Sequence, residues 1–389
     1  MTDDSGVTDN TGVTVDSGTT GAGDLSNLPP LATIYAYVTS GCNCACRHCW
    51  IVPDVRSAGS KPRHDLSIDD LRAAVEEALP LGLAAIKWTG GEPTVNPNFP
   101  DLLRVQAEHG LEGRLETNGM LVDADLARLL RESGVTDVAV SIDGATAETH
   151  DAIRGVRGAF ERARRGLQHV AEAGIWSQAI FSLMRSNVGE LDRFLDLAET
   201  LGVRSVKLNV VQPTLRGEEM HAAQETLTIA EYLEIARRLD DLPADSHSFR
   251  IFMDVPMAFR SIGDLMSGGI YDACGIKNII GLLPDGSYAL CGIGERMPDL
   301  CFGQAGRGEL ATIWREHPVI LALREQLPRG LQGICSRCAM SAACLGGCIA
   351  QNYYRTHDLM APHWFCVDAE RDGRFPTTRI IAQKQESGR

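Results

Sequence analysis

The first thirty residues contain no lysine and no arginine, and nowhere does the chain have an apolar run near the roughly 20 residues that a membrane-spanning helix requires. A secretory signal has a basic start followed by an apolar segment, and this terminus has neither. Its content of Gly, Ser, Thr and Asp predicts a disordered acidic tail over residues 1–30. We therefore expect a cytoplasmic protein without a membrane partner.

Basic residues are scarce along the whole chain. The sequence has 37 Lys and Arg against 51 Asp and Glu, which gives a net charge of −14. An acidic surface argues against a nucleic-acid partner bound through its phosphates. The length of 389 residues, 44% of them hydrophobic, is enough for a large buried core and predicts two domains.

Cysteine is absent between Cys49 and Cys274, although the chain has 12 cysteines. Four of them lie at positions 42–49 in GCNCACRHCW, and the other eight lie between 274 and 366. In a reducing compartment such clusters are more often metal ligands or redox groups than disulfides. The gap also separates a middle segment from a cysteine-rich C-terminal segment.

Strand-like and helix-like patterns alternate through the middle segment. The strand candidates are rich in β-branched residues and cover 31–38, 84–89, 113–117, 137–142, 177–184 and 205–211. Predicted N-caps of the helices between them are Ser67, Asn98, Asp123 and Asn187. Six β-α units in series predict a parallel α/β sheet, either doubly wound or closed into a partial barrel.

Polar or glycine-rich motifs follow the first four strands. They are the cysteine cluster, Thr89-Gly90-Gly91-Glu92-Pro93, Thr117-Asn118-Gly119 and Ser141-Ile142-Asp143-Gly144. Active sites of barrel enzymes are built on the loops at the C-terminal ends of the strands. Four such motifs in register predict a single site, whereas one alone would be an ordinary turn.

The first cysteines have the spacing C-x3-C-x2-C at Cys42, Cys46 and Cys49. Three thiolates on one loop can bind three irons of a [4Fe–4S] cluster and leave the fourth iron open. With the GGEP motif, residues 31–240 resemble the radical S-adenosylmethionine (SAM) enzymes. The resemblance implies a partial (β/α)6 TIM-type barrel. It also implies that the open iron chelates SAM, whose reductive cleavage gives a 5′-deoxyadenosyl radical that abstracts a hydrogen atom.

The same resemblance gives roles to the strand-end motifs. Gly90 and Gly91 would let the backbone approach the methionine moiety of SAM, and Glu92 would accept a hydrogen bond from its ammonium group. Thr117 and Ser141 would face the ribose or the carboxylate, and the further SAM-binding candidates are Asn118 and Asp143.

Residues around these motifs have competing interpretations. Arg154 and Arg157 would neutralise the SAM carboxylate, or they form a solvated helix start. His48 and Trp50 flank the last ligand, near the place the family gives to the adenine, although Trp50 also suits core packing. Cys44 departs from the family pattern, and is either a spare thiol or a group for redox chemistry at the site.

The C-terminal cysteines form a second pattern. A single C-x2-C pair is typical of a zinc ribbon, and two zinc sites stay open as an alternative. The whole string over 265–370 is similar to the SPASM extension of some radical SAM enzymes, whose seven cysteines hold two auxiliary [4Fe–4S] clusters. By that resemblance the outer cluster has the ligands Cys335, Cys338, Cys344 and Cys366. The inner cluster has the ligands Cys274, Cys291 and Cys348.

The inner cluster lacks an obvious fourth ligand. The residues after Cys274 are GIKNIIG, where the family often has a further cysteine. The fourth iron of the inner cluster therefore has an open position, binds Cys301 or binds a more distant ligand. The sequence assigns no catalytic residue, and Cys301 and Cys44 are candidate thiols for such a role. In sulfatase-maturing relatives an aspartate follows the cysteine that matches Cys291, and Gly292 in its place argues against formylglycine formation.

The resemblance implies a cofactor set of three [4Fe–4S] clusters and SAM, and a substrate that is a ribosomally made peptide receiving a crosslink, an oxidation or an epimerisation. Implied partners are a flavodoxin or ferredoxin as electron donor and a separate leader-peptide-binding protein, since only ~30 residues precede the first strand. The alternatives are a small-molecule enzyme acting on an aminoglycoside or cofactor precursor, and a non-enzymatic metal scaffold.

The predicted segments are the tail 1–30, the barrel 31–240, a bridging segment 241–264, the SPASM domain 265–375 and a C-terminal tail 376–389.

Overall fold

The protein was analysed as a computed structural model that describes residues 28–55, 63–243, 245–266 and 275–381. Nearly all of the predicted tail 1–30, part of the predicted tail 376–389, and Cys274 lie outside these ranges. Within them, no helix has the length and the apolar character needed to cross a bilayer.

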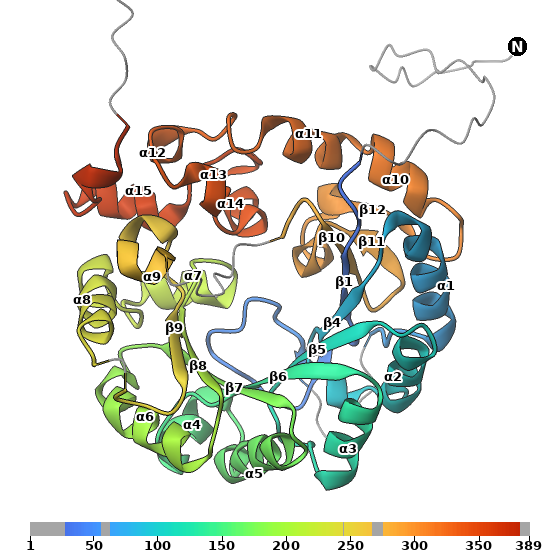
Figure 1. Ribbon diagram of the computed structural model, residues 1–389, viewed down its shortest axis with the longest axis horizontal. Helices are drawn as coiled ribbons and strands as arrows, with labels where there is room; N and C mark the ends of the chain where they lie inside the picture. Colours follow the sequence, from blue (N-terminus) through green and yellow to red (C-terminus); the bar gives the residue numbers. More distant parts are fainter. Residues whose placement is uncertain (1–27, 56–62, 244, 267–274, 382–389) are drawn as a thin grey trace, which may run out of the picture.

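Seven parallel strands form an incomplete barrel (Figure 1). They are β1 (Thr33–Tyr37), β4 (Ala85–Thr89), β5 (Glu112–Thr117), β6 (Val135–Ser141), β7 (Trp176–Leu183), β8 (Ser205–Val210) and β9 (Arg250–Met253). The first six coincide with the six predicted strands, so the parallel α/β fold is confirmed. The seventh, β9, pairs with β8 and falls inside the segment predicted as a bridge.

Helices cover the outer face of the sheet (Figure 1). They are α1 (Ile68–Ala78), α2 (Phe99–Glu108), α3 (Ala124–Glu132), α4 (Ala147–Arg154), α5 (Ala159–Glu172), α6 (Leu191–Thr200), α8 (Ile229–Asp240) and α9 (Ile262–Met266). The short helix α7 (Arg216–Ala222) lies instead inside the ring, beside the first cysteine loop. Ser67 and Asp123 cap α1 and α3 through their side chains, as predicted. Asn98 stands at the N-cap of α2 without a side-chain cap bond, and Asn187 precedes a short 3-10 turn.

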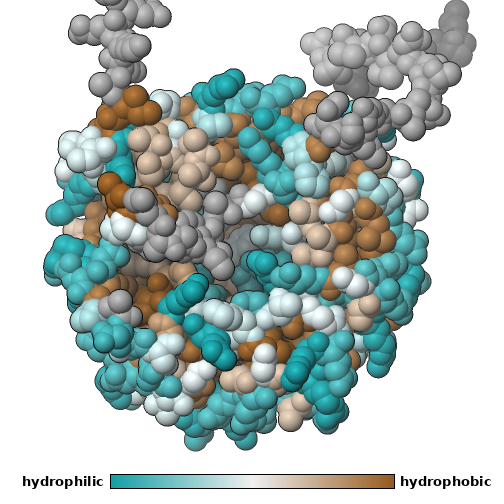
Figure 2. Space-filling view, viewed as in Figure 1, coloured by the Kyte–Doolittle hydropathy of each residue, from teal (hydrophilic) through white to brown (hydrophobic). Residues whose placement is uncertain are grey.

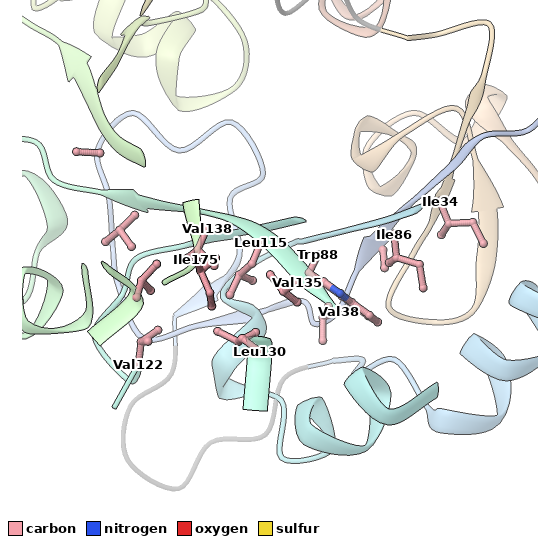
Figure 3. Close-up of a cluster of buried hydrophobic side chains, with 14 of the residues drawn as sticks. Ile34, Val38, Ile86, Trp88, Leu115, Val122, Leu130, Val135, Val138 and Ile175 are labelled. Atoms are coloured by element: carbon pink, nitrogen blue, oxygen red, sulfur yellow. The ribbon is translucent and has the colours of Figure 1, made fainter. Parts of the chain in front are cut away.

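The main core lies between the strands and these helices. Alternate residues of neighbouring strands, including Ile34, Ile86, Trp88 and Leu115, project into it (Figure 3). The indole of Trp88 donates to Oε1 of the fully buried Gln106 at 2.6 Å, which satisfies both polar groups. The other residues of each strand face the barrel interior, since side chains alternate across a sheet.

The cysteine-rich segment continues the same sheet. Its strands are β10 (Ile279–Leu282), β11 (Ser287–Ala289) and β12 (Cys301–Gln304). β10 lies parallel to β1, with Thr33 opposite Ile279, and β11 and β12 follow as antiparallel strands. β1 is therefore an interior strand, held by the barrel on one side and by the C-terminal segment on the other.

The remaining helices lie along the open side of the barrel (Figure 1). They are α10 (Leu310–Glu316), α11 (Pro318–Gln326), α12 (Gly333–Ser336), α13 (Ser341–Cys344), α14 (Ile349–Thr356) and α15 (Trp364–Arg371). α10 contacts α1 and α15 contacts α8, so the segment joins both ends of the ring. Figure 2 shows a hollow near the centre of this face, inside the ring.

Candidate active site

The first cysteine loop begins directly after β1 and closes into a short two-strand pair. Its strands β2 (Gly41–Cys42) and β3 (Asp54–Val55) are parallel. The backbone N–H of Ala45 donates to the carbonyl of Arg154, and the guanidinium of Arg216 donates to the carbonyl of Cys46 at 2.9 Å. The loop is thus fixed at the C-terminal mouth of the barrel, where the sequence predicts the site.

All three predicted cluster thiols lie on this loop. Cys42 and Cys46 are buried and Cys49 is half-buried. The backbone N–H of Cys44 donates to Sγ of Cys42 at 3.3 Å. Three free thiols on one short loop, with a backbone donor aimed at one sulfur, are the donor set that a site-differentiated [4Fe–4S] cluster requires.

A buried ion pair stands beside the loop. Arg154 lies 2.6 Å from a carboxylate oxygen of Asp143 and donates to Sγ of Cys46 at 3.5 Å. Burial raises the pKa of Asp143. Arg154, His48 and the backbone N–H of Ser182 lower it by more than burial raises it, so the net shift is downward. A hydrogen bond with the Cys44 thiol and the charge of Arg154 hold the pKa of Cys46 well below its usual range. Arg154 therefore places positive charge next to a thiolate, and Asp143 holds its guanidinium there.

This arrangement excludes one of the two interpretations of Arg154, and its predicted role toward SAM stays a prediction. The side chain is almost fully buried, which excludes a solvated helix start at this position. Arg157 is exposed, as that alternative predicts. In the described structure the carboxylate paired with Arg154 is the protein's own Asp143.

The two glycines of the GGEP motif bring two loops together. Gly90 has a φ of +128°, a conformation that disfavours any side chain. A Cβ on Gly91 would lie 2.0 Å from the carbonyl oxygen of Gly41. Glycine is thus required at both positions for the GGEP loop to contact the cysteine loop. The close approach of Gly90 and Gly91 to SAM stays a prediction.

Glu92 joins the loops that follow β4 and β5. Its Oε1 accepts hydrogen bonds from the Thr117 hydroxyl at 2.6 Å and from the Thr94 hydroxyl at 2.6 Å. Its Oε2 accepts one from the backbone N–H of Asn118 at 2.7 Å. Burial raises the pKa of Glu92, and these donors act against that rise. Oε2 keeps capacity for a second donor, which is what the predicted contact with an ammonium group needs.

The other predicted SAM-binding residues lie on the same mouth. Asn118 donates to the side-chain oxygen of Asn43 in the cysteine loop at 2.6 Å. Ser141 is the half-buried last residue of β6, in register with Ile180 of β7. The structure therefore brings Glu92, Thr117 and Asn118 into one network, and Asp143 and Arg154 into another.

Cys44 is buried, and its thiol contacts Sδ of Met120 at 3.4 Å. Hydrogen bonds with Cys42 and Cys46, followed by burial, raise its pKa strongly. His48 lies 3.6 Å from Asp143, and Trp50 packs partly buried against Tyr37 and its neighbours. Sequence reasoning missed Asn43, Arg216 and Met120, because nothing in their local sequence indicates contact with the cysteine loop.

The four cysteines predicted for the outer cluster line one small pocket. They are Cys335, Cys338, Cys344 and Cys366, and the rest of the lining is mostly apolar. Backbone N–H groups of Met340 and His363 donate to two of the sulfurs at 3.3 and 3.5 Å. Burial, with repulsion from neighbouring thiols, raises the pKa of Cys335 to about 11 and also raises the pKa of Cys366. The cavity is therefore unfavourable for several bare thiolates and well suited to thiolates bound to iron.

The predicted inner ligands are incompletely described. Cys291 and Cys348 stand at helix starts and pack against the same C-terminal hydrophobic cluster. Cys274 lies outside the described residues. The Cys301 thiol donates to the carbonyl of Gly294 at 3.3 Å, only three residues beyond Cys291.

Within the described ranges, no three His, Cys, Asp or Glu side chains converge closely enough to hold a single metal ion. The thiolates of an iron–sulfur cluster each bind a different iron, so they need not meet at one point. The spread of the described thiols is compatible with clusters.

Comparison with known proteins adds independent findings. A model of the radical SAM superfamily matches residues 36–199. Mycofactocin maturase MftC of Mycobacterium ulcerans is 30% identical over 340 residues, which cover 85% of this chain and 86% of that protein. AdoMet-dependent heme synthase of Methanosarcina barkeri is 29% identical over 360 residues, covering 88% and 97%. The crystal structure of Streptococcus suis SuiB bound to precursor peptide SuiA has a TM-score of 0.67 at 16% identity, covering 87% of this chain and 76% of SuiB, and so shares the fold.

Proposed function

The chain belongs to the radical SAM superfamily, and from that premise we propose that it modifies a ribosomally made peptide by crosslinking, oxidation or epimerisation. As a member of this family it is an enzyme that uses a [4Fe–4S] cluster and SAM. The proposal of a peptide substrate depends on the similarity to mycofactocin maturase over most of both chains. The fold shared with SuiB, which was crystallised with its precursor peptide, supports it.

We assign the SAM-binding cluster to Cys42, Cys46 and Cys49, as the spacing predicts. When bound there, the cluster supplies the electron that cleaves SAM and so generates the radical. The residues of the chain bind and orient: Arg154 places positive charge beside the Cys46 sulfur, and the rigid Glu92 network holds the neighbouring loops. The proposed SAM contacts are Gly90, Gly91, Glu92, Thr117, Asn118, Ser141 and Asp143, with Arg154 acting through Asp143.

We further propose two auxiliary clusters in the segment 265–375. The four-thiol cavity supports the outer one, with ligands Cys335, Cys338, Cys344 and Cys366. Cys274, Cys291 and Cys348 would hold the inner one, and Cys301, whose thiol donates to the carbonyl of Gly294 three residues after Cys291, is the candidate fourth ligand. Held by these cysteines, such clusters would supply one-electron redox chemistry close to the barrel.

The proposed organisation keeps the predicted segments, with a barrel over 31–240, a bridge over 241–264 and the auxiliary segment over 265–375. We propose a flavodoxin or ferredoxin as electron donor, a separate leader-peptide-binding protein and a cytoplasmic location. Reduced thiol ligands persist in that compartment, which supports the last point.

A second candidate function is supported by one comparison. The similarity to an AdoMet-dependent heme synthase extends over 97% of that protein. A small-molecule substrate, such as a cofactor precursor, is therefore the alternative to a peptide.

The deciding experiment measures 5′-deoxyadenosine by mass spectrometry after anaerobic reconstitution. Wild-type protein and the Cys46→Ala variant are incubated with SAM and a strong reductant, with and without candidate peptides encoded near the gene. We expect product only in the wild type, with peptide raising the yield and the peptide losing two hydrogens or changing one stereocentre. Product formation that responds to small molecules and ignores every peptide would establish the alternative.

A further inference from the structure

An open pocket of about 290 Å³ lies between the first cysteine loop and α7, which are neighbours inside the ring (Figure 1). Ala45, Cys46 and Arg47 of the loop form one wall, and Arg216 and Glu219 of α7 stand on the other. Pockets for whole small ligands have volumes of roughly 300–1,000 Å³, so this one is the right size for a single amino-acid side chain. None of the proposed SAM contacts lines it.

Contacts between the two walls fix the shape of the pocket. The guanidinium of Arg216 donates to the carbonyl of Cys46 at 2.9 Å. The guanidinium of Arg47 donates to both carboxylate oxygens of Glu225, which follows α7, at 2.6 Å. Because both contacts join α7 and its flank to the cysteine loop, the pocket is formed before any ligand arrives.

α7 is also held at its ends and on its far side. Leu215 directly precedes it with a φ of +53°, and Gln224 follows it with a φ of +58°. Non-glycine residues keep such a conformation only where the surrounding structure imposes it. On the far side, the ring of His221 packs edge-on against Trp364 of α15, with ring centroids 5.4 Å apart. α7 is therefore a rigid wall between the first cysteine loop and the C-terminal segment.

The charges around the pocket are unequally paired. Arg47 and Glu225 neutralise each other, and Arg216 is directed at the Cys46 carbonyl. Glu219 lies three residues along α7 from Arg216 and is exposed. Its carboxylate has no hydrogen bond or ion pair with any residue that the structure describes. The pocket thus has one carboxylate available for a ligand, which is complementary to an ammonium or guanidinium group.

We propose that this pocket is a substrate subsite in which Glu219 binds a lysine or arginine side chain of the peptide. The inference rests on the proposed peptide substrate and gives that substrate a charge preference. The net charge of −14 on the whole chain favours the approach of a basic peptide. A side chain bound here lies against the loop that carries Cys46, so the neighbouring residues of the peptide extend over the mouth of the barrel.

The test measures equilibrium binding of three synthetic peptides to anaerobically reconstituted protein by fluorescence anisotropy. Each is a glycine- and serine-based heptapeptide with an uncharged dye and one central Arg, Gln or Glu. The wild type should bind the Arg peptide about tenfold more tightly than the Gln peptide, the worth of one charge-assisted hydrogen bond, and the Glu peptide most weakly. Glu219→Gln should abolish the preference for Arg over Gln, and Glu219→Lys should make the Glu peptide the preferred one.

Glu218→Gln is the matched control. Glu218 is the adjacent exposed carboxylate of α7, but it does not line the pocket and instead accepts from the Tyr354 hydroxyl at 3.5 Å. This variant should bind all three peptides as the wild type does.

Two kinds of failure are distinguishable. Equal or undetectable binding of the three peptides by the wild type, or a preference for Arg that survives Glu219→Gln, would overturn the inference and leave the 5′-deoxyadenosine assay untouched. Preferred binding of the Arg peptide through Glu219, in a protein that modifies none of the peptides encoded near its gene, would instead overturn the proposed peptide modification and leave a subsite for a basic group.

Discussion

Replacing Asp143 by asparagine removes the negative partner of a guanidinium that is almost completely buried. Asp143 is 0% exposed and Arg154 8% exposed, and their closest atoms are 2.6 Å apart. Breaking one side of such a pair costs about 3–5 kcal/mol, because the remaining charge stays in a medium that solvates it poorly. Asparagine keeps the size of the side chain, so the loss is electrostatic and not a cavity effect.

The expected change in melting temperature can be worked out from the size of the chain. An unfolding entropy of about 2.1 cal/mol/K per residue gives about 0.8 kcal/mol/K for 389 residues. A loss of about 3–5 kcal/mol then lowers the melting temperature by about 4–6 °C. Differential scanning calorimetry of anaerobically reconstituted protein measures this shift.

Two further variants make the experiment specific. Asp125→Asn makes the same chemical change in an exposed ion pair. The side chain of Asp125 is 81% exposed and that of its partner Arg128 is 64% exposed. This variant should shift the melting temperature by about 1 °C or less. Adding Arg154→Met to Asp143→Asn should recover most of the loss, because no buried charge remains. Equal melting temperatures for Asp143→Asn and Asp125→Asn would refute the reasoning.

Three other predictions concern the loops and the pH response. Gly91→Ala should abolish 5′-deoxyadenosine formation and remove about four irons, because its Cβ would overlap the Gly41 carbonyl, whereas Gly189→Ala, with open space around it, should match the wild type. Cys338→Ala should lose about four irons and still cleave SAM; loss of cleavage would show that the clusters are not independent. Burial lowers the pKa of His150 to about 4, so the folded state binds its proton less well than the unfolded state, and stability present above pH 6.5 is lost as pH falls toward about 4. Urea denaturation should show roughly 1.4 kcal/mol of that loss by pH 5.5, and His150→Gln should be less sensitive to pH over this range.

The strands and the positions of their loops follow from local sequence. Runs of β-branched residues predict the six barrel strands because both faces of such strands are buried. The strand-end motifs meet because parallel strands in register end at one edge. β9 was missed because Arg250–Met253 is only 4 residues long and lacks a β-branched run.

Contacts between distant segments could not be predicted in this way. The pairing of β10 with β1 joins residues far apart in sequence, and Ile279–Leu282 carries no signal that names its partner. The cysteine spacings predict cluster ligands but do not predict the Asp143–Arg154 pair, since burial of an arginine depends on the tertiary structure. The contact between the Tyr37 ring and Gly292 likewise could not be predicted, because it joins two segments that are far apart in the sequence.

The place of β1 inside the sheet has a consequence for synthesis of the protein. This strand is made early, but its neighbour β10 leaves the ribosome only after some 240 further residues, as the pairing of Thr33 with Ile279 requires. Contacts of such long sequence separation form late in folding. The first cysteine loop, which follows the end of β1, therefore gains this support only when more than two thirds of the chain has been translated. Iron delivery to that loop is then expected late in synthesis, after β10 has paired with β1.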